Sequence, residues 1–456
     1  MIPMSLREVA RVTGGHVAGD AEVVVSGAAY LDSRRPVPGG LFVAIAGDRV
    51  DGHAYAAGAH AVLGSRATAA PTVVVRDPVV ALARLARHVV DAVRPTVLAV
   101  TGSHGKTATK DHLAWLLPGA LATTGNLNNE LGVPLTCLGL RPATEHLVLE
   151  MGARGVGQLS WLCEVAPPDV AAVLGVGSAH VGRFGSTELI AVAKGELVEA
   201  LGPGGTAVLN ADDPRVAAMT SRTVARVLTF GLAGDVTWRS VTLDAHGRPS
   251  FELGYAGAWE PVRLTRVGRH QIANATAAAA MALAVGEPLA AIADRLSRCP
   301  AASPHRMQPR VREDGLMVLD DSYNANPESV TAALETLVAV GRHRTGRTVA
   351  VLGEMCELGD LGPGAHRAVG RRARELGVDV VVSVGAAADG IGLAAAGVPT
   401  AGIDEALAWL ADELDAGDVA LVKASRAGGL DQLVDALLAL GPGRATTVRT
   451  TGTDKP

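Results

Sequence analysis

The segment 97–110 constrains this chain more than any other, because it joins an apolar run to a glycine-rich turn and then to a helical pattern. The run 96–100 predicts a buried strand. Gly102 and Gly105 then free the backbone to curl before an amphipathic helix begins near Lys106. This order of strand, glycine turn and helix is the frame of a phosphate-binding loop.

The turn also carries the chemistry of a phosphate site. A helix N-terminus offers an anion unpaired N–H groups and about half a positive charge. Lys106 adds a full positive charge, and Thr107 offers a hydroxyl to Mg²⁺. The spacing is a compressed Thr-Gly-x-x-Gly-Lys-Thr, since Val100 stands where the usual loop has its first glycine. We predict a nucleoside triphosphate site, with a glycine-rich turn bearing a solvated lysine as the alternative.

Composition narrows the class of protein. The 456 residues exceed one ordinary core and suggest roughly two to four domains. Hydrophobic residues make up 48%, yet no run of about eighteen apolar residues occurs, so no membrane insertion is expected. A net charge of −5 with 3% aromatic residues favours no nucleic-acid partner. The first ten residues carry charges and no long apolar stretch, which predicts a cytoplasmic protein without a targeting segment.

The part before the phosphate-binding strand combines turns and two helical patterns with short β-like runs at 23–25, 41–45 and 72–75. Ser33 and Arg34 precede a glycine turn and a strand, where they could hold a second anion such as a diphosphate. From the residues alone, a surface ion pair between Asp32 and Arg34 is favoured instead. Pro95 marks a domain boundary.

From residue 96 to about 300, strand, loop and helix alternate, which predicts a mostly parallel sheet with helices on both faces. The predicted strands are 96–100, 146–149, 170–174 and 207–209. Ligands bind beyond the carboxyl ends of such strands, where Glu150, His180, Asn210 and Asp212 lie. Glu150 suits Mg²⁺, and His180 suits a metal or a phosphate. A turn-capping glutamate and an ordinary loop histidine remain the alternatives.

Two further helices of this part carry polar residues. Lys194 lies on a helical pattern that begins near Thr187 and by itself indicates a solvated face. Gln271 and Asn274 precede or open an alanine-rich helix at 275–285, where their amides could read a base edge or cap the helix. A change of composition at 297–304 predicts an interdomain linker.

A new α/β unit begins at about His305. Its predicted strands are 317–319, 348–352, 378–384 and 419–422, and its predicted helices are 327–340, 365–376, 404–412 and 430–440. Polar loops at 320–327 and 423–426 follow two of these strands, so we expect them to face one cleft. The tail 443–456 is rich in Thr and Gly and is predicted to be disordered.

Taken in order, these motifs resemble the Mur ligases of peptidoglycan synthesis from about residue 32 to 440. Within that family they are most similar to the branch that joins D-alanyl-D-alanine (D-Ala-D-Ala) to UDP-N-acetylmuramoyl-tripeptide (UDP-MurNAc-tripeptide). The resemblance rests on short fragments at 32–34, 51–53, 101–107, 126–129, 132–134, 150–152, 179–180, 193–196, 210–214, 323–327, 353–355 and 423–426. Each fragment alone is a weak signal, but this many in one order is specific.

The resemblance implies an α/β fold of three domains, in a protein expected to be a monomer. These are a small N-terminal α/β substrate domain for the UDP-sugar at 1–95, a central P-loop parallel-sheet ATPase domain at 96–303 and a C-terminal Rossmann-like α/β ligase domain at 304–442.

The resemblance also assigns roles to residues. ATP would be bound by Gly102, Ser103, Gly105, Lys106, Thr107, Gln271, Asn274, Arg306 and Asp321. Two Mg²⁺ ions would be held by Thr107, Glu150, His180 and Lys194, the last as a carbamate formed with CO₂. Lys106, Lys194 and His180 would be catalytic. The substrates would be contacted by Ser33, Arg34, Asn126, Asn129, Tyr323, Asn326, Lys423, Ser425 and Arg426.

The implied reaction is an ATP-dependent amide ligation. The terminal carboxylate of the tripeptide would attack the γ-phosphorus of ATP to give an acyl phosphate and ADP, and the amine of D-Ala-D-Ala would then displace phosphate. Closure of the third domain would exclude water from the intermediate. Departures from the family pattern at Ala108, Gly175 and Gln271 leave room for a paralogue that joins another acceptor, such as a depsipeptide or a natural-product building block. A catalytically silent nucleotide-binding regulator is the alternative of another class.

Overall fold

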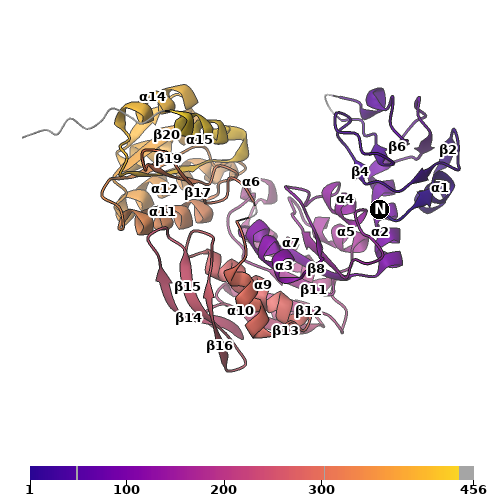
Figure 1. Ribbon diagram of the computed structural model, residues 1–456, viewed down its shortest axis with the longest axis horizontal. Coiled ribbons are helices and arrows are strands. Elements are labelled where there is room, and N and C mark those ends of the chain that lie inside the picture. The colour runs from indigo at the N-terminus through magenta and orange to yellow at the C-terminus, as the bar shows by residue number, and fades with distance from the viewer. Residues whose placement is uncertain (48–49, 302, 441–456) are drawn as a thin grey trace, which may run out of the picture.

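The computed structural model describes residues 1–47, 50–301 and 303–440. Three groups of strands and helices follow one another along the chain and lie in a row, the N-terminal group at one end and the group after residue 305 at the other (Figure 1). We call them the N-terminal region (residues 1–95), the central region (96–303) and the third region (304–440). The predicted tail 443–456 lies outside the described residues.

The N-terminal region is built on a small mixed sheet in the order β2-β7-β6-β5-β4. Its strands are β2 (His16–Ala18), β4 (Ala29–Tyr30), β5 (Leu41–Val43), β6 (Ala61–Gly64) and β7 (Thr72–Val74), beside the separate pair β1 (Met4–Ser5) and β3 (Val24–Val25). Its helices are α1 (Leu6–Thr13) and α2 (Pro78–Val93). Asp77 accepts hydrogen bonds from the N–H groups of Val79 and Val80, which explains why α2 begins at Pro78. The three β-like runs predicted from the sequence correspond to β3, β5 and β7.

The central region surrounds a larger sheet in the order β16-β15-β14-β13-β12-β11-β8-β10-β9. Its strands are β8 (Thr96–Thr101), β9 (Leu121–Ala122), β10 (His146–Glu150), β11 (Val170–Val173), β12 (Thr206–Asn210), β13 (Arg226–Phe230), β14 (Val236–Leu243), β15 (Pro249–Tyr255) and β16 (Ala258–Arg263). Neighbouring strands from β9 to β14 are parallel, which confirms the predicted sheet. The strands β14, β15 and β16 pair antiparallel, an extension that the sequence pattern did not predict.

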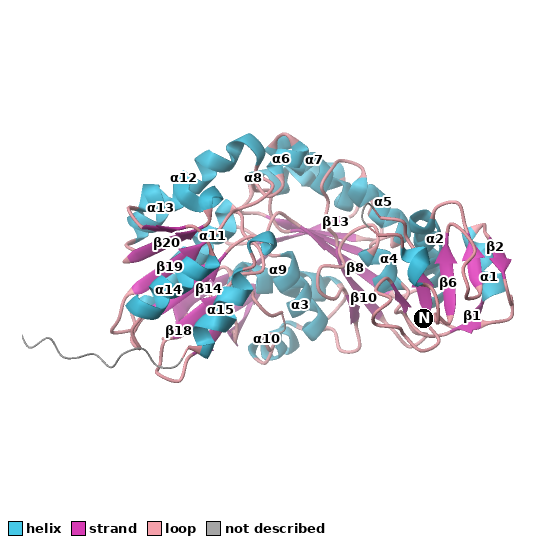
Figure 2. Cartoon of the chain, turned by 90° about the horizontal axis from the view of Figure 1, so that it is seen from above, coloured by secondary structure: helices cyan, strands magenta, loops and turns pink. Residues whose placement is uncertain are grey.

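Helices cover both faces of the central sheet (Figure 2). They are α3 (Lys106–Leu116), α4 (Gly132–Cys137), α5 (Gln158–Val165), α6 (Val181–Phe184), α7 (Thr187–Glu199), α8 (Pro214–Ala217), α9 (Gln271–Ala284) and α10 (Leu289–Ser297). Alternate residues of β8 enter two different cores: Val97 joins the core that contains α5 and α7, and Leu98 joins the core that contains α3, α9 and α10. This alternation places the start of α3 at the carboxyl edge of a strand that is buried on both faces.

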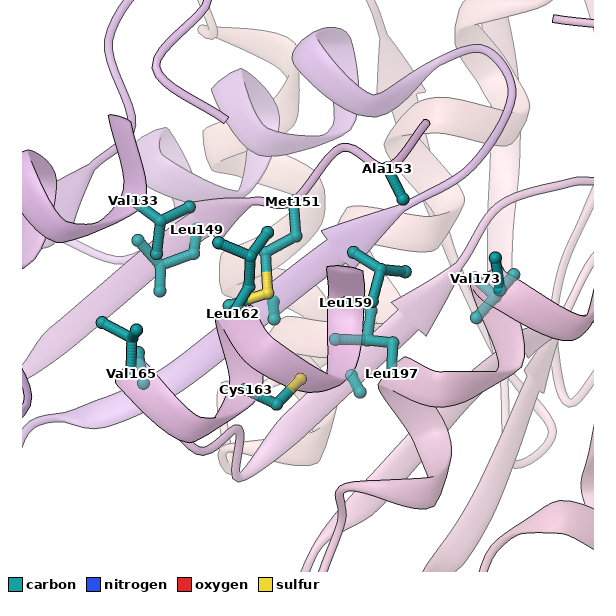
Figure 3. Close-up of a cluster of buried hydrophobic side chains, with 14 of the residues drawn as sticks. Val133, Leu149, Met151, Ala153, Leu159, Leu162, Cys163, Val165, Val173 and Leu197 are labelled. Carbon is teal, nitrogen blue, oxygen red and sulfur yellow. The ribbon is translucent and has the colours of Figure 1, made fainter. Parts of the chain in front are cut away.

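The spacing of apolar residues on α5 explains how this helix packs against the central sheet and α7. Figure 3 shows Leu159 and Leu162 of α5 close to Met151, which follows β10, and to Leu197 of α7. All four side chains are buried. Because leucines three residues apart lie on one face of a helix, α5 presents a continuous apolar surface to the sheet.

The third region is a second α/β unit, with strand order β17-β18-β22-β19-β20-β21. Its strands are β17 (Gln308–Val311), β18 (Met317–Asp320), β19 (Thr348–Leu352), β20 (Val380–Val384), β21 (Val398–Thr400) and β22 (Val419–Lys423). Its helices are α11 (Pro327–Gly341), α12 (Gly362–Leu376), α13 (Asp389–Ala395), α14 (Ile403–Glu413) and α15 (Leu430–Ala439). The predicted strands and helices of this unit are all present, with ends that shift by up to three residues. Among the helices of the described residues, none has the length and apolar composition that a bilayer span requires.

Candidate active site

The turn after β8 forms a tight loop around the start of α3. Gly102 and Gly105 have φ angles of 159° and 79°, and a Cβ atom at Gly105 would collide with the side chain of Asn274. Because Gly105 has no side chain to cap α3, the first N–H groups of that helix stay available to an anion. Lys106 Nζ donates to the carbonyl of Gly102 at 2.8 Å, so its charge lies over the loop. Ser103 Oγ is engaged elsewhere, since it accepts from Gly177 N–H at 2.9 Å.

The hydroxyl of Thr107 and the carboxylate of Glu150 meet beside this loop. Thr107 Oγ1 donates to Glu150 Oε2 at 2.8 Å, and Asn128 Nδ2 donates to Glu150 Oε1 at 2.7 Å. Glu150 is 3% exposed and ends β10, the neighbour of β8. The structure therefore brings together the two residues that we predicted to share a metal ion. It also adds Asn128, which the sequence analysis did not select although it belongs to the quoted fragment 126–129.

These groups fit a hard cation. Within the described residues, no three His, Cys, Asp or Glu side chains gather as a metal site. The protein donors near the loop are a hydroxyl and a carboxylate, and such a pair suits Mg²⁺, which takes its other ligands from phosphate oxygens and water. The arrangement matches a metal that arrives with a nucleotide.

Lys194 is buried rather than solvated, so the interpretation that its helical pattern alone favoured is wrong. It lies on α7 and is 4% exposed, and Ala193 and Leu197 of the same helix are also buried. Burial lowers the pKa of Lys194 well below its ordinary value, and the positive charge of Lys106 adds to the shift. Burial also lowers the pKa of Lys106, which Glu150 opposes and Arg306 reinforces. Lys106 and, from the third region, Arg306 therefore bring positive charge to this end of the sheet, and the charge of Lys106 together with burial favours the neutral form of the Lys194 amine.

His180 lies in the turn before α6 and faces the third region. Its Nδ1 is bonded to Oε2 of Glu357, and Arg183 Nε lies 3.5 Å from the other oxygen of that carboxylate. Burial lowers the pKa of His180; Glu357 opposes the shift, while the charges of Lys106 and Lys194 reinforce it. The imidazole therefore lies near both lysines but is held by a carboxylate that the sequence did not indicate.

A second acidic residue of the third region holds the same turn. Glu328 on α11 accepts from Ser178 N at 2.8 Å and from Ser178 Oγ at 3.1 Å. The predicted strand-end residues Asn210 and Asp212 bond to the ends of the neighbouring strands: Asn210 Nδ2 donates to the carbonyl of Leu174 after β11, and Asp212 accepts from the N–H groups of Leu232 and Ala233 after β13. Neither of these two reaches the phosphate-binding loop through a bond of its own.

The predicted base-binding residues lie at the start of α9. Asn274 Nδ2 donates to Gln271 Oε1 at 3.2 Å, and Gln271 Nε2 lies 3.0 Å from His270 Nε2. Burial lowers the pKa of His270 to about 4; the charge of Asp321 opposes the shift and that of Lys423 reinforces it. A Cβ atom at Gly268, just before α9, would lie 3.0 Å from Thr336 Oγ1 of α11, so the start of α9 packs against the third region.

The loops that follow β18 and β22 meet, as predicted. Lys423 Nζ donates to Asp321 Oδ2 at 2.6 Å and to the carbonyl of Asn324 at 2.8 Å. The guanidinium groups of Arg306 and Arg426 lie 4.1 and 5.7 Å from the ring centroid of Tyr323. This cluster places two cations around one aromatic ring at the edge of the third sheet.

Several predicted substrate residues serve the fold in this structure. Asn326 caps α11 by accepting from Ser329 N at 2.8 Å, and Asn129 Oδ1 accepts from Gly132 N at 3.0 Å at the start of α4. Ser425 Oγ accepts from Cys356 N at 2.8 Å, and Arg426 pairs with Asp431 at 3.2 Å. These four side chains therefore already have partners within the fold.

Asp32 and Arg34 form the surface ion pair that the residues alone favoured. Arg34 forms a two-bond ion pair with Asp32, at 2.8 and 2.9 Å, on the surface. A groove of about 690 Å³ between the N-terminal and central regions is lined by Asp32 of this pair together with Tyr30, Arg35 and Asn126, whereas Arg34 is not among its lining residues. No hydrogen bond of the described residues involves the Ser33 side chain. Arg35 is thus a candidate that the sequence analysis missed, although it is adjacent to the predicted pair.

Comparisons with known proteins agree with this geometry. The profile of the Mur ligase middle domain matches residues 100–282, and that of the Mur ligase glutamate ligase domain matches residues 305–426. The UDP-N-acetylmuramoyl-tripeptide--D-alanyl-D-alanine ligase of Mycobacterium tuberculosis is 41% identical, covering 96% of this chain and 98% of the relative.

Solved structures give the same picture. MurF from Acinetobacter baumannii superposes with a TM-score of 0.87 at 30% identity, over 96% of this chain and 99% of that one. The MurF ligase from Thermotoga maritima in complex with ADP superposes with a TM-score of 0.80 at 31% identity, over 91% of this chain and 97% of that one. The likeness therefore extends over all three regions.

Proposed function

This chain belongs to the Mur ligase family, and we propose from that premise that it adds D-Ala-D-Ala to UDP-MurNAc-tripeptide at the expense of ATP, in peptidoglycan precursor synthesis. One observation within the chain carries the proposal. Thr107 and Glu150 are hydrogen-bonded to each other next to Lys106 in the central region, and the positive charge of Arg306 from the third region acts on Lys106. Full-length similarity to relatives that bear this activity supports the choice of substrates.

We assign the three parts of the reaction to three domains, with boundaries at 1–95, 96–303 and 304–442. The N-terminal domain binds the UDP-sugar, the central domain binds ATP, and the third domain brings the acceptor. The enzyme acts as a cytoplasmic monomer in this proposal. A size measurement in solution tests the monomer, because a stable dimer would double the mass.

The charges around the phosphate-binding loop explain how this site would activate a carboxylate. The tripeptide carboxylate and the triphosphate repel each other, and Lys106 and Arg306 offset that repulsion. Attack of the tripeptide carboxylate on the γ-phosphorus of ATP releases ADP and leaves an acyl phosphate. The free amine of D-Ala-D-Ala then attacks the acyl carbon, and phosphate departs with the formation of an amide.

We further propose that Mg²⁺ is held by Thr107 and Glu150 at one position and by His180 and carbamylated Lys194 at a second. Bound there, the ions would supply positive charge to the phosphoryl group under attack. The low pKa of Lys194 supports the carbamate, because only a neutral amine attacks CO₂ and releases a proton. Once carbamylated, the residue would be an anion with two oxygen donors.

The decisive experiment measures phosphate release with ATP, Mg²⁺, UDP-MurNAc-tripeptide and D-Ala-D-Ala, each omitted in turn. We expect release only with all four present. Release that requires a different acceptor would show a paralogue of altered specificity. ATP binding without release, whichever acceptor is offered, would show a silent nucleotide-binding protein.

A further inference from the structure

His180 and Glu357 are both held in an unusual backbone conformation where the central and third regions meet. His180 has φ of +64° and Glu357 has φ of +63°, which non-glycine residues rarely adopt. Such strain persists only where surrounding contacts fix it, and it concentrates at functional sites. The two side chains face each other and are bonded through His180 Nδ1 and Glu357 Oε2, although 177 residues separate them along the chain.

The backbones of the central and third regions are also in direct contact beside this pair. Gly182 N donates to the carbonyl of Glu357 at 3.1 Å. A Cβ atom at Gly182 would lie 2.5 Å from the nitrogen and 2.9 Å from the Cα of Gly359, so only glycine fits there. Figure 1 places α6, which contains Gly182, at the junction of the central and third regions.

The turn is also fastened on its other side. Ser178 bonds to Glu328 of α11 through both its N–H group and its hydroxyl. Two carboxylates of the third region thus grip the turn at Ser178 and His180, on either side of Ala179. A third-region residue therefore sets the orientation of the His180 imidazole, because Glu357 engages one ring nitrogen and leaves the other, Nε2, for a ligand.

Histidines that bind metals commonly donate their second ring N–H to a carboxylate, which fixes the tautomer and the direction of the ring. We propose that Glu357 is the positioning residue for His180, so that docking of the third region completes the second proposed metal position. This inference rests on the proposed function, in which His180 is a metal ligand. When the third region is undocked, His180 loses its carboxylate and its fixed orientation.

The test uses Glu357→Ala and Glu357→Gln, with Glu375→Gln as the matched control. Glu375 is an acidic residue of the same region that pairs with Arg372 at 3.4 Å on the surface. The first readout is the ¹⁵N spectrum of histidine-labelled protein, in which the His180 resonances are assigned with His180→Gln. We expect a single Nδ1–H tautomer in the wild type and in Glu375→Gln, and a mixture of tautomers in Glu357→Ala.

The second readout is the binding of Mn²⁺ in the presence of ADP, followed by electron paramagnetic resonance. We expect Glu357→Ala to weaken the second ion roughly 10- to 100-fold, the usual cost of losing a residue that orients a metal ligand. The first ion, at Thr107 and Glu150, should be unaffected. Glu357→Gln keeps an acceptor oxygen and should fall between the wild type and Glu357→Ala.

A second variant perturbs the same contact while both Glu357 and His180 remain in place. Gly182→Ala keeps every proposed ligand but forces the turn away from Gly359, and it should reproduce the tautomer mixture and the weakened second ion. Unchanged tautomer and Mn²⁺ affinity in Glu357→Ala would overturn the proposal, as would an equal loss in Glu375→Gln. Neither the ¹⁵N spectrum nor Mn²⁺ binding requires turnover. Failure of the ligase assay in the wild type would therefore reject the proposed function and not the role of Glu357.

Discussion

The two junctions of this molecule are built differently. The N-terminal region joins the central region through α2, which packs on α4 and α5, and buried residues of α2 such as Leu85 share a core with Cys137 and Leu162. The third region is joined by bonds from carboxylates as well, at Ser178 and His180. Apolar packing has no preferred direction and depends on no single partner atom, whereas a carboxylate can exchange its partner for water or a metal ion. We therefore expect ligands to move the third region more than the N-terminal one.

The largest effect is expected at the phosphate-binding loop of the central region. Lys106→Ala removes the full charge that lies over the loop. We expect kcat to fall roughly 100- to 1,000-fold, the usual cost of losing one group that stabilises transition-state charge. Steady-state phosphate release measures the loss, and thermal melting checks that the fold is intact. A variant within a few-fold of the wild type would mean that the anion is held elsewhere.

A second test concerns the linker that precedes the third region. Ser303 Oγ donates to Asp111 Oδ2 at 2.6 Å, and Asp111 also bonds Lys110 and Arg266 inside the protein, on the helix that follows the phosphate-binding loop. Burial alone would raise the pKa of Asp111, but Lys110, Ser303 and Arg266 bring it below its ordinary value. The linker is therefore anchored to an ionised carboxylate.

Ser303→Ala should lower the free energy of unfolding by about 1.5–3 kcal/mol, since the lost hydrogen bond is to a charged group. Ser221→Ala is the control, because Ser221 Oγ donates only to the local carbonyl of Ala218 on the surface. Denaturant titration measures both variants. In small-angle scattering with a nucleotide analogue, Ser303→Ala should broaden the distribution of third-region positions. Equal losses in the two variants would remove the linker from this picture.

Elements that are specified by a few consecutive residues could be predicted more closely than those that depend on distant contacts. The strand 96–101 and the start of α3 follow from a few consecutive residues, so they were predicted closely. The antiparallel strands after residue 236 were missed because β14 is partly exposed on both faces and lacks a continuous apolar run. Lys194 was first read as solvated because α7 is buried on several sides and has little amphipathic contrast. Tertiary context overrode the local pattern there.

The candidate site follows the same rule. Thr107 and Glu150 could be predicted because each ends or follows a recognisable strand of one sheet. Glu357 could not be predicted as the partner of His180, because 177 residues separate the two and its left-handed backbone is visible only in three dimensions. Arg35 was missed for a subtler reason: the residue next to it forms the ion pair, and spacing alone cannot decide which of two adjacent arginines faces a groove.

A smaller effect is expected from pH, on the helix that carries Lys106. His112 is fully buried on α3, and within the described residues neither of its ring nitrogens has a hydrogen-bond partner. Burial lowers its pKa to about 3, with Arg266 reinforcing the shift and Asp111 opposing it. The unfolded chain takes up this proton near its ordinary pKa of 6.5, but the folded chain does not until about 3. Folding therefore loses stability as the pH falls through this window.

His112→Leu should remove that dependence. The stability advantage of the variant over the wild type should be about 2 kcal/mol larger at pH 5 than at pH 8, because 1.5 units below the ordinary pKa correspond to about that free energy. Thermal melts of both proteins at the two pH values measure it. A constant difference between the proteins across this range would show that His112 titrates in the folded state as it does in the unfolded chain.

The smallest effects should appear at the first junction, where they separate two adjacent arginines. Arg34 is 87% exposed in its side chain and is occupied by Asp32, so Arg34→Ala should change KM for the UDP-linked substrate by less than about twofold. Arg35 lines the groove between the regions, and Arg35→Ala should raise that KM about tenfold, or about 1.4 kcal/mol of binding, with kcat nearly unchanged. Such a split would mark binding far from the reacting groups, in contrast to the loss of kcat expected for Lys106→Ala. If Arg34→Ala is instead the more damaging change, the surface pair must open to receive substrate, and the groove at Arg35 is not where the sugar nucleotide binds.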